Sequence, residues 1–211
     1  MQSNTQARDF KCPDCGEIFE LKSAQGFNKQ RIVDAGYEAM MRAIRGDRTP
    51  NLLVMQYSAS WSVSNLLLVP KFFFTESAIE KRKPLGLSAR RAGWIGCNIL
   101  LSQIPEAGKI LVVSQGAIIP PGEVRSQFRQ LTPLAALKPR LRGWTLDVLK
   151  VIQGLDRPVF SLRDIYTYEK QLGEVHPANQ NVRPKIRQQL QVLRDLGLLQ
   201  FLGQGQYHLL I

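Results

Sequence analysis

Apolar residues recur along this chain with two different periods, and each period predicts a different kind of element. Alternating or continuous apolar runs predict strands in NLLVMQYSA, WSVSNLLLVP, CNILLSQIP and GKILVVSQGAII, with the first two paired. Helical spacing predicts helices over residues 33–45 and in PPGEVRSQFRQL, whose prolines suit the start of a helix. TESAIEKR is weakly capped and predicts a short helix at best. The first part of the chain therefore mixes strands and helices.

A different order of elements follows the segment PLAALKPRLRG, in which two prolines, a glycine and basic residues indicate a domain boundary. Helices are predicted in WTLDVLKVIQGL, LRDIYTYEKQLGE and RPKIRQQLQVLRDLG, with a short PVFS between the first two. Two short strands then meet at Gly203 and Gly205. Three helices ending in a two-stranded hairpin is the order of a winged helix-turn-helix. We therefore expect one domain over residues 1–138 and a DNA-binding domain over residues 139–211.

Charge points to a polyanionic partner. The chain has 28 Lys and Arg against 17 Asp and Glu, a formal net charge of +11. Such an excess is typical of proteins that bind nucleic acid. No apolar run approaches the roughly 18 residues of a membrane helix, and the N-terminus has no apolar signal segment. Three cysteines are too few for a disulfide framework. We expect a cytoplasmic protein that binds DNA and no membrane.

The stretch DFKCPDCGEIFELKS, residues 9–23, predicts a hairpin with candidate chemistry at its open end. If its turn is centred between Asp14 and Cys15, Asp9 faces Glu20 at about 5 Å. Glu20 and Lys22 share one face of their strand. Carboxylate oxygens suit Mg²⁺, and a lysine can orient or deprotonate an attacking water. The same spacing also fits an ordinary solvated strand face.

The two cysteines at the tip of this hairpin form a separate candidate site. Cys12 and Cys15 have the C-x-x-C spacing of half a zinc site. They lie roughly 10 Å along a strand from Asp9, so both sites can coexist. A structural zinc needs four ligands, but Cys97 is distant and both histidines lie in the predicted winged domain. A redox pair and a vestige remain open alternatives.

Two further segments are candidates for contact with DNA. The loop KRKPLGLSARRAGW contains arginines that can fork onto guanine or clamp phosphates, and an indole that offers apolar area. The segment around the last helix is polar at its start, as in a recognition helix. The alternatives are a tryptophan in the core with a solvated loop, and an amphipathic core helix with a wet face. The candidate residues are Arg82, Arg90, Arg91, Trp94, Asn179, Asn181, Arg183, Lys185, Gln188 and Gln189.

Long blocks of this sequence resemble the DpnI-like, Dam-replacing family of type II restriction endonucleases. The blocks are FELKS, RKPLGLSARRAGWIGCNI, LSQIP, RGWTLDVL and KIRQQLQVLRDLGLL, and the likeness runs from about residue 7 to the C-terminus. The triplet Asp9, Glu20 and Lys22 is similar to the signature of PD-(D/E)xK nucleases. The resemblance implies an α/β (α+β) PD-(D/E)xK restriction-endonuclease-like domain followed by a winged helix-turn-helix domain. It also implies Mg²⁺-dependent cutting of double-stranded DNA at GATC sites carrying N6-methyladenine.

The resemblance also implies roles for single residues. Asp9 and Glu20 would hold the catalytic magnesium, with the Leu21 carbonyl as a further ligand, and Lys22 would contact the water and the phosphate. Trp94 would touch the adenine methyl groups. Cys12 and Cys15 would be half of a structural zinc site.

One departure from the family pattern concerns the N-terminus. The family has a second C-x-x-C upstream of the catalytic aspartate, whereas this sequence starts eight residues before Asp9. We therefore expect an N-terminally truncated enzyme, whose zinc occupancy and activity depend on the absent part. The main alternative is a non-catalytic reader of methylated DNA that binds through the winged helix, and another is a transcription regulator. We expect a monomer, and the sequence is equally consistent with a monomer that nicks each strand in turn and with two copies acting on the palindromic site.

Overall fold

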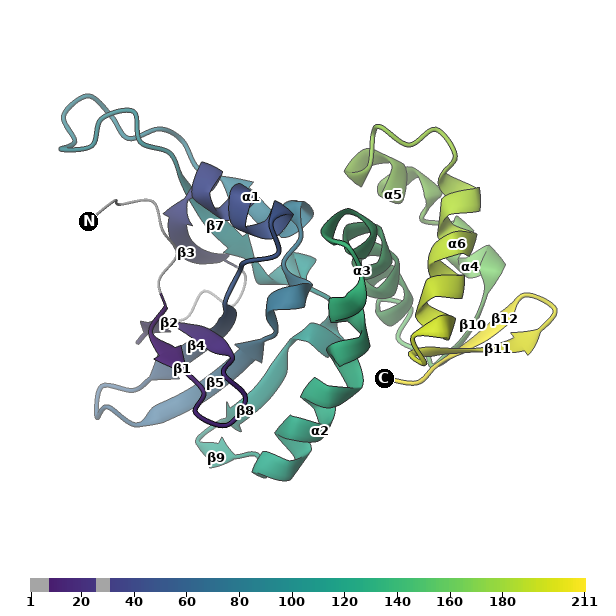
Figure 1. Cartoon of the computed structure of the whole chain (residues 1–211), viewed down its shortest axis with the longest axis horizontal. Coiled ribbons are helices and arrows are strands. Elements are labelled where there is room, and N and C mark those ends of the chain that lie inside the picture. The colour runs from purple at the N-terminus through teal and green to yellow at the C-terminus, as the bar shows by residue number, and fades with distance from the viewer. Residues whose placement is uncertain (1–7, 26–30) are drawn as a thin grey trace.

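The computed structural model describes residues 8–25 and 31–211, and its elements fall into a sheet-rich part and a helical part (Figure 1). The larger sheet has the strand order β1-β2-β4-β5-β8-β9. Only β2 and β4 run parallel, and the other neighbours are antiparallel. Its strands are β1 (Phe10–Lys11), β2 (Ile18–Ala24), β4 (Asn51–Tyr57), β5 (Val63–Val69), β8 (Ile110–Ser114) and β9 (Ala117–Ile118).

The central strands of this sheet are apolar because they are covered. Leu52 and Val54 of β4 and Leu68 and Val69 of β5 are buried. The predicted pairing of these two runs is confirmed, with Leu53 opposite Leu68. Such nearly continuous apolar runs are typical of strands buried on both faces.

A smaller sheet with the order β3-β7-β6 lies beside the first. It consists of β3 (Arg31–Gly36), β7 (Gly96–Leu100) and β6 (Ile79–Lys81), and β3 leads directly into α1 (Tyr37–Arg45). The predicted helix over residues 33–45 is therefore wrong at its start. Burial alternates along β3, which is the period of a strand. TESAIEKR is likewise mostly not helical, because a single turn, η2 (Glu76–Ala78), passes into β6.

Short 3-10 turns and two longer helices complete the sheet-rich part and lead out of it. The turns are η1 (Lys71–Phe73), η3 (Leu101–Gln103), η4 (Glu106–Gly108) and η5 (Thr132–Ala136), and the helices are α2 (Pro121–Leu131) and α3 (Pro139–Gln153). As predicted, α2 begins at a proline. The six consecutive residues 144–149 of α3 are all buried, so this helix is covered on every side. It contacts α1 and η1 on one side and α6 on the other, between the two parts of the molecule (Figure 1).

The C-terminal part is a winged helix-turn-helix, as predicted. Its three-stranded sheet has the order β10-β12-β11. The predicted helix over LRDIYTYEKQLGE is two helices, because a turn at Thr167 and Tyr168 interrupts it. The elements are β10 (Val159–Ser161), α4 (Leu162–Tyr166), α5 (Glu169–Val175), α6 (Val182–Asp195), β11 (Leu199–Gly203) and β12 (Gln206–Leu209).

The structure thus has the expected class, a mixed α+β domain followed by a winged helix-turn-helix domain. Within residues 8–25 and 31–211, every helix is too short or too polar to cross a bilayer.

Candidate active site

The opening hairpin has the register that the sequence predicted. Phe10 pairs with Phe19 and Lys11 with Ile18, so residue numbers across the ladder add to the same sum. Just outside β1, the Asp9 amide donates to the Phe19 carbonyl at 2.9 Å. The Asp9 carboxylate in turn accepts the Leu21 amide at 2.7 Å. Asp9 therefore lies on the edge of β2, where the predicted catalytic residues are.

Glu20 and Lys22 come together on β2, as their spacing predicted. The strand is fixed on both sides, by β1 and by the parallel strand β4, where Glu20 pairs with Leu52 and Lys22 with Val54. The ammonium Nζ of Lys22 lies 2.6 Å from Oε1 of Glu20, whose side chain is only 3% exposed. A buried acid and lysine in contact are not a solvated strand face.

Asp34 is a third charged residue of this cluster, and sequence reasoning missed it. It lies on β3, and its Oδ1 is 2.8 Å from Nζ of Lys22, with no exposed side-chain area. Neither carboxylate oxygen of Asp34 accepts a well-formed hydrogen bond from the described residues. The available signal was the alternating pattern of RIVDAG, which places Asp34 on the inward face of a strand.

The electrostatics of the cluster follow from two buried carboxylates sharing one ammonium. Burial, followed by the charge of Asp34, raises the pKa of Glu20 to about 7. Burial alone would lower the pKa of Lys22, but Asp34 and Glu20 outweigh it and the pKa lies above its usual value. Lys22 is therefore an ammonium at neutral pH, and the cluster has a net negative charge once Glu20 ionises.

These residues fit a magnesium ion by the chemistry of their donors. Oε1 of Glu20 is paired with the Lys22 ammonium, and the carboxylate keeps further lone pairs that a cation could share. Asp9 and the backbone of Leu21 lie at the adjacent edge of the strand. Mg²⁺ prefers such oxygen ligands and keeps several waters. In the described part of the chain, however, no three Asp, Glu, His or Cys side chains lie close enough together to form a complete metal site by themselves.

The cysteine pair is only half of a zinc site in the described structure. Amide groups of Cys15 and Asp14, and then the Cys15 thiol, lower the pKa of Cys12, which favours the thiolate that zinc binds. Cys97 is buried and donates to the Ala35 carbonyl at 3.3 Å, away from this turn. Tetrahedral zinc needs two further ligands. The residues present do not complete that set.

The loop between β6 and β7 is closed by backbone hydrogen bonds, from the Arg82 amide to Gly96 at 3.0 Å and from the Leu85 amide to Trp94 at 2.9 Å. The predicted arginines Arg82, Arg90 and Arg91 are exposed. The guanidinium of Arg91 lies 4.6 Å from the centre of the Trp94 ring. The indole is half-buried over Gly96, so Trp94 is not a core residue.

Most of the candidate residues near α6 lie at the surface. Asn181, Arg183 and Gln188 are exposed, whereas Asn179 and Lys185 are half-buried. Arg183 pairs with Glu169 at 2.7 Å, and Lys185 donates to Gln188 at 2.7 Å.

Gln189 is the exception among these residues. It is fully buried and accepts the Thr145 hydroxyl of α3 at 2.8 Å. The prediction that Gln189 contacts DNA is therefore wrong for this structure. Its side-chain amide is hydrogen-bonded on the inner face of the helix. Counting polar residues along the sequence cannot distinguish this inner face from the outer one.

A mixed sheet with a buried acid–lysine cluster, followed by a helix-turn-helix domain, is the architecture of a protein that acts on DNA. The Dam-replacing family, DpnI, matches residues 1–136, and the Dam-replacing helix-turn-helix domain matches residues 140–209. The chain belongs to this family. Membership implies a methylation-dependent restriction endonuclease.

Proposed function

We propose that this protein is a Mg²⁺-dependent type II endonuclease that cuts double-stranded DNA at GATC sites carrying N6-methyladenine. The contact of Lys22 with two buried carboxylates, Glu20 and Asp34, carries the proposal. Burying a charge is costly unless the charge is paired, so two acids around one lysine are a feature that a purely structural strand does not need. The family supports the DNA substrate and its methylation.

The chain's own residues have distinct tasks in this mechanism. Asp9, Glu20 and the Leu21 carbonyl would hold the magnesium. When bound, Mg²⁺ would offset charge on the scissile phosphate and make a bound water more acidic. Lys22 would orient the attacking water and contact the phosphate. Asp34 keeps Nζ of Lys22 in place.

The loop over residues 82–95 is the proposed reader of the methyl group. The Trp94 indole offers flat apolar area, and Arg91 over its face fixes the ring. An N6-methyl group packed on this ring contributes about 0.8 kcal/mol by burial. The exposed arginines of the loop can each donate two parallel hydrogen bonds to guanine or to a phosphate. The loop runs into β7, which pairs with the strand of Asp34, so the reading loop and one residue of the charged cluster belong to the same sheet.

The proposal is tested with two plasmids that differ only in adenine methylation at GATC, each incubated with the purified chain and Mg²⁺. We expect the methylated plasmid alone to be cut, and we expect Asp9→Ala and Lys22→Ala to abolish cutting. Asp14→Ala is the matched control, because Asp14 is an exposed acid in the same hairpin and contacts neither Glu20 nor Lys22. Asp9 is also exposed, so its substitution leaves the core intact.

Two other outcomes would reject the proposal in different ways. Tighter binding to the methylated plasmid without any cutting would make the chain a non-catalytic reader that acts through its winged helix. Cutting that ignores methylation would retain the nuclease and reject the role of the loop. Unchanged cutting by Asp9→Ala would show that the hairpin is not the active site.

A further inference from the structure

A trough lies between the two parts of the molecule. It is formed by two adjoining cavities of about 750 and 610 Å³, which share Lys138, Arg140 and His176 in their walls. The first cavity extends along α1 to Tyr37, and the second extends to Lys185 near the start of α6. We call this the interdomain trough.

The two ends of the trough coincide with the two proposed DNA-reading elements. At one end, the Tyr37 amide donates to Ile95 of the 82–95 loop at 3.0 Å, and Nζ of Lys81 lies 5.1 Å from the Tyr37 ring. At the other end, Asn179 and Lys185 belong to the polar start of the recognition helix. A ligand that follows the trough therefore reaches from one reading element to the other.

The charge of the trough is positive after its internal pairs are counted. Arg45 is neutralised by Glu76, with Nε and Oε1 2.8 Å apart. His176 is likewise paired with Asp147 at 2.8 Å. Among the described residues that line the two cavities, Glu76 is the one with a carboxylate.

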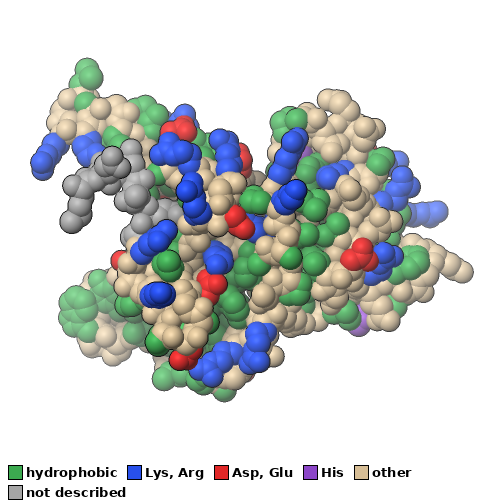
Figure 2. Space-filling model, viewed as in Figure 1, with side chains coloured by type: hydrophobic (Ala, Val, Ile, Leu, Met, Phe, Trp, Pro, Cys, Tyr) green, Lys and Arg blue, Asp and Glu red, His purple; other side chains and the backbone are tan. Residues whose placement is uncertain are grey.

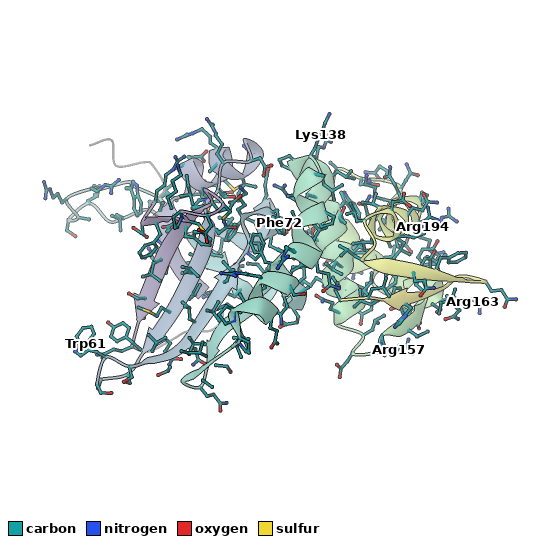
Figure 3. The ribbon with its side chains drawn as sticks, turned by 60° about the horizontal axis from the view of Figure 1, so that its bottom comes forward. Trp61, Phe72, Lys138, Arg157, Arg163 and Arg194 are labelled. Carbon is teal, nitrogen blue, oxygen red and sulfur yellow. The ribbon has the colours of Figure 1, made fainter. Side chains whose placement is uncertain are left out.

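Three cations in the trough lack an acidic partner. Lys185 donates to the neutral amide of Gln188. Lys138 and Arg140 are exposed, and neither contacts a carboxylate within the part of the chain that the structure describes. Figure 3 shows Lys138 at the start of α3, pointing away from the protein.

The surroundings of these cations strengthen the positive field. Figure 2 shows Lys and Arg side chains on both sides of the hollow between the two parts of the molecule. Both α3 and α6 have no acidic residue in their first turn, so the positive ends of both helices are uncompensated. Phosphate groups are the ligands that fit cations and helix ends arranged along a line.

We infer that the sugar–phosphate backbone of bound DNA lies along the interdomain trough, held by Lys138, Arg140 and Lys185, so that one duplex contacts both parts of the protein. This inference rests on the proposed function, because it takes DNA as the ligand of both reading elements. It adds phosphate contacts that belong to neither the nuclease cluster nor the 82–95 loop. Such contacts set position and affinity but carry no sequence information.

The test is the salt dependence of DNA binding without Mg²⁺, measured by fluorescence anisotropy on a labelled duplex with one methylated GATC. Losing two phosphate contacts in Lys138→Ala, Arg140→Ala should reduce the slope of log K against log salt by about 1.8. Preference for the methylated duplex should stay unchanged. Both side chains are exposed, so thermal unfolding should match the wild type and show an intact fold.

The matched control is Arg125→Ala, Arg129→Ala, which removes the same charge from exposed positions on α2, remote from the trough (Figure 1). We expect a slope close to that of the wild type. An unchanged slope in the Lys138 and Arg140 variant, or equal losses in both double variants, would overturn the inference. The second result would mean that only net charge matters. If the wild-type chain bound no DNA, the proposed function and the trough would both fall, whereas methyl-dependent cutting with an unchanged slope would reject the trough alone.

Discussion

Lys22 on the larger sheet and Asp34 on the smaller sheet form an ion pair with Nζ and Oδ1 2.8 Å apart. The pair links the two sheets at the strand that carries the proposed metal ligand Glu20. Asp34 is fully buried, and its role is to hold the lysine rather than to touch a substrate. It is a positioning residue of the proposed nuclease.

Asp34→Asn should lower cleavage without weakening DNA binding. Removing the charge loosens Nζ of Lys22, and a misplacement of about 1 Å at a reacting group can cost roughly 10²-fold in rate. We expect a loss of that order in single-turnover cleavage of methylated DNA, with the affinity measured without Mg²⁺ unchanged. Asp14→Asn, in the exposed turn, serves as the control. A wild-type cleavage rate for Asp34→Asn would show that Glu20 alone positions Lys22.

Gly96→Ala should reduce the preference for methylated DNA while leaving the fold intact. A Cβ at Gly96 would lie 2.8 Å from ring atoms of Trp94, so the indole must swing away from its place. Losing a methyl contact of about 0.8 kcal/mol lowers discrimination by roughly fourfold for each methyl group. The measurement is the ratio of affinities for methylated and unmethylated duplexes.

Gly86→Ala is the control for this variant, because a Cβ at Gly86 in the same loop meets no atom within 4 Å. Its ratio of affinities should equal that of the wild type. Full methyl preference in Gly96→Ala would exclude the Trp94 ring as the methyl contact.

Asp47→Ala should destabilise the protein although Asp47 itself is exposed. Its partner Arg142 is almost wholly buried, with one further bond to the Leu137 carbonyl at 3.3 Å. Removing one partner of a buried pair leaves an uncompensated charge, which costs about 3 kcal/mol, or a fall in Tm of roughly 10 °C. Thermal unfolding followed by circular dichroism measures the shift.

The backbone at Asp47 requires a matched control. Asp47 and Asp156 have φ values of 51° and 53°, so alanine is strained equally at either position. Asp156 is exposed and has no ionic partner among the described residues. We therefore expect Asp156→Ala to lose only the strain component. Equal shifts in the two variants would argue against a contribution of the Arg142 pair.

The Ser161–Asp164 capping box at the start of α4 should make the winged domain sensitive to acid. The Ser161 amide and then its hydroxyl lower the pKa of Asp164, and Arg157 acts in the same direction. A depressed pKa in the folded state stabilises the fold above the unfolded value of about 3.9, and this stabilisation is lost as the pH falls through the folded value.

Asp164→Asn should therefore lower Tm at neutral pH, and its difference from the wild type should shrink as the pH falls below about 3.9. Thermal unfolding across this range measures the effect. Asp195→Asn, which removes an exposed carboxylate that pairs with its neighbour Arg194 and lies outside the capping box, is the control. A difference that stays constant with pH would mean that the carboxylate charge contributes nothing to the cap.

Local pattern was sufficient to predict several elements. The position of the turn in the opening hairpin fixes which side chains face each other across the ladder. The register was therefore predictable from the Pro-Asp-Cys-Gly turn. The apolar runs of β4 and β5 and the amphipathic face of α6 were predictable for the same reason, because burial of one face sets their period.

What could not be predicted depends on contacts between distant segments. Asp34 joins the site because β3 pairs with β7, a strand that starts at Gly96, and spacing within β3 carries no information on that pairing. Gln189 looked like a surface residue because its partner Thr145 belongs to another helix. The start of α1 was misplaced because the short strand before it has an apolar content that also fits a helix turn.

The crossed arrangement of strands has a consequence for synthesis of the protein. Glu20 and Lys22 leave the ribosome before the segments that fix the cluster, because their strand β2 is fixed by β4, and Asp34 is fixed by β7, which ends at Leu100. The charged cluster therefore cannot assemble until the chain has been made as far as Leu100. The loop over residues 82–95 precedes Leu100, so a nascent chain contains the proposed methyl-reading loop before the proposed nuclease centre can assemble.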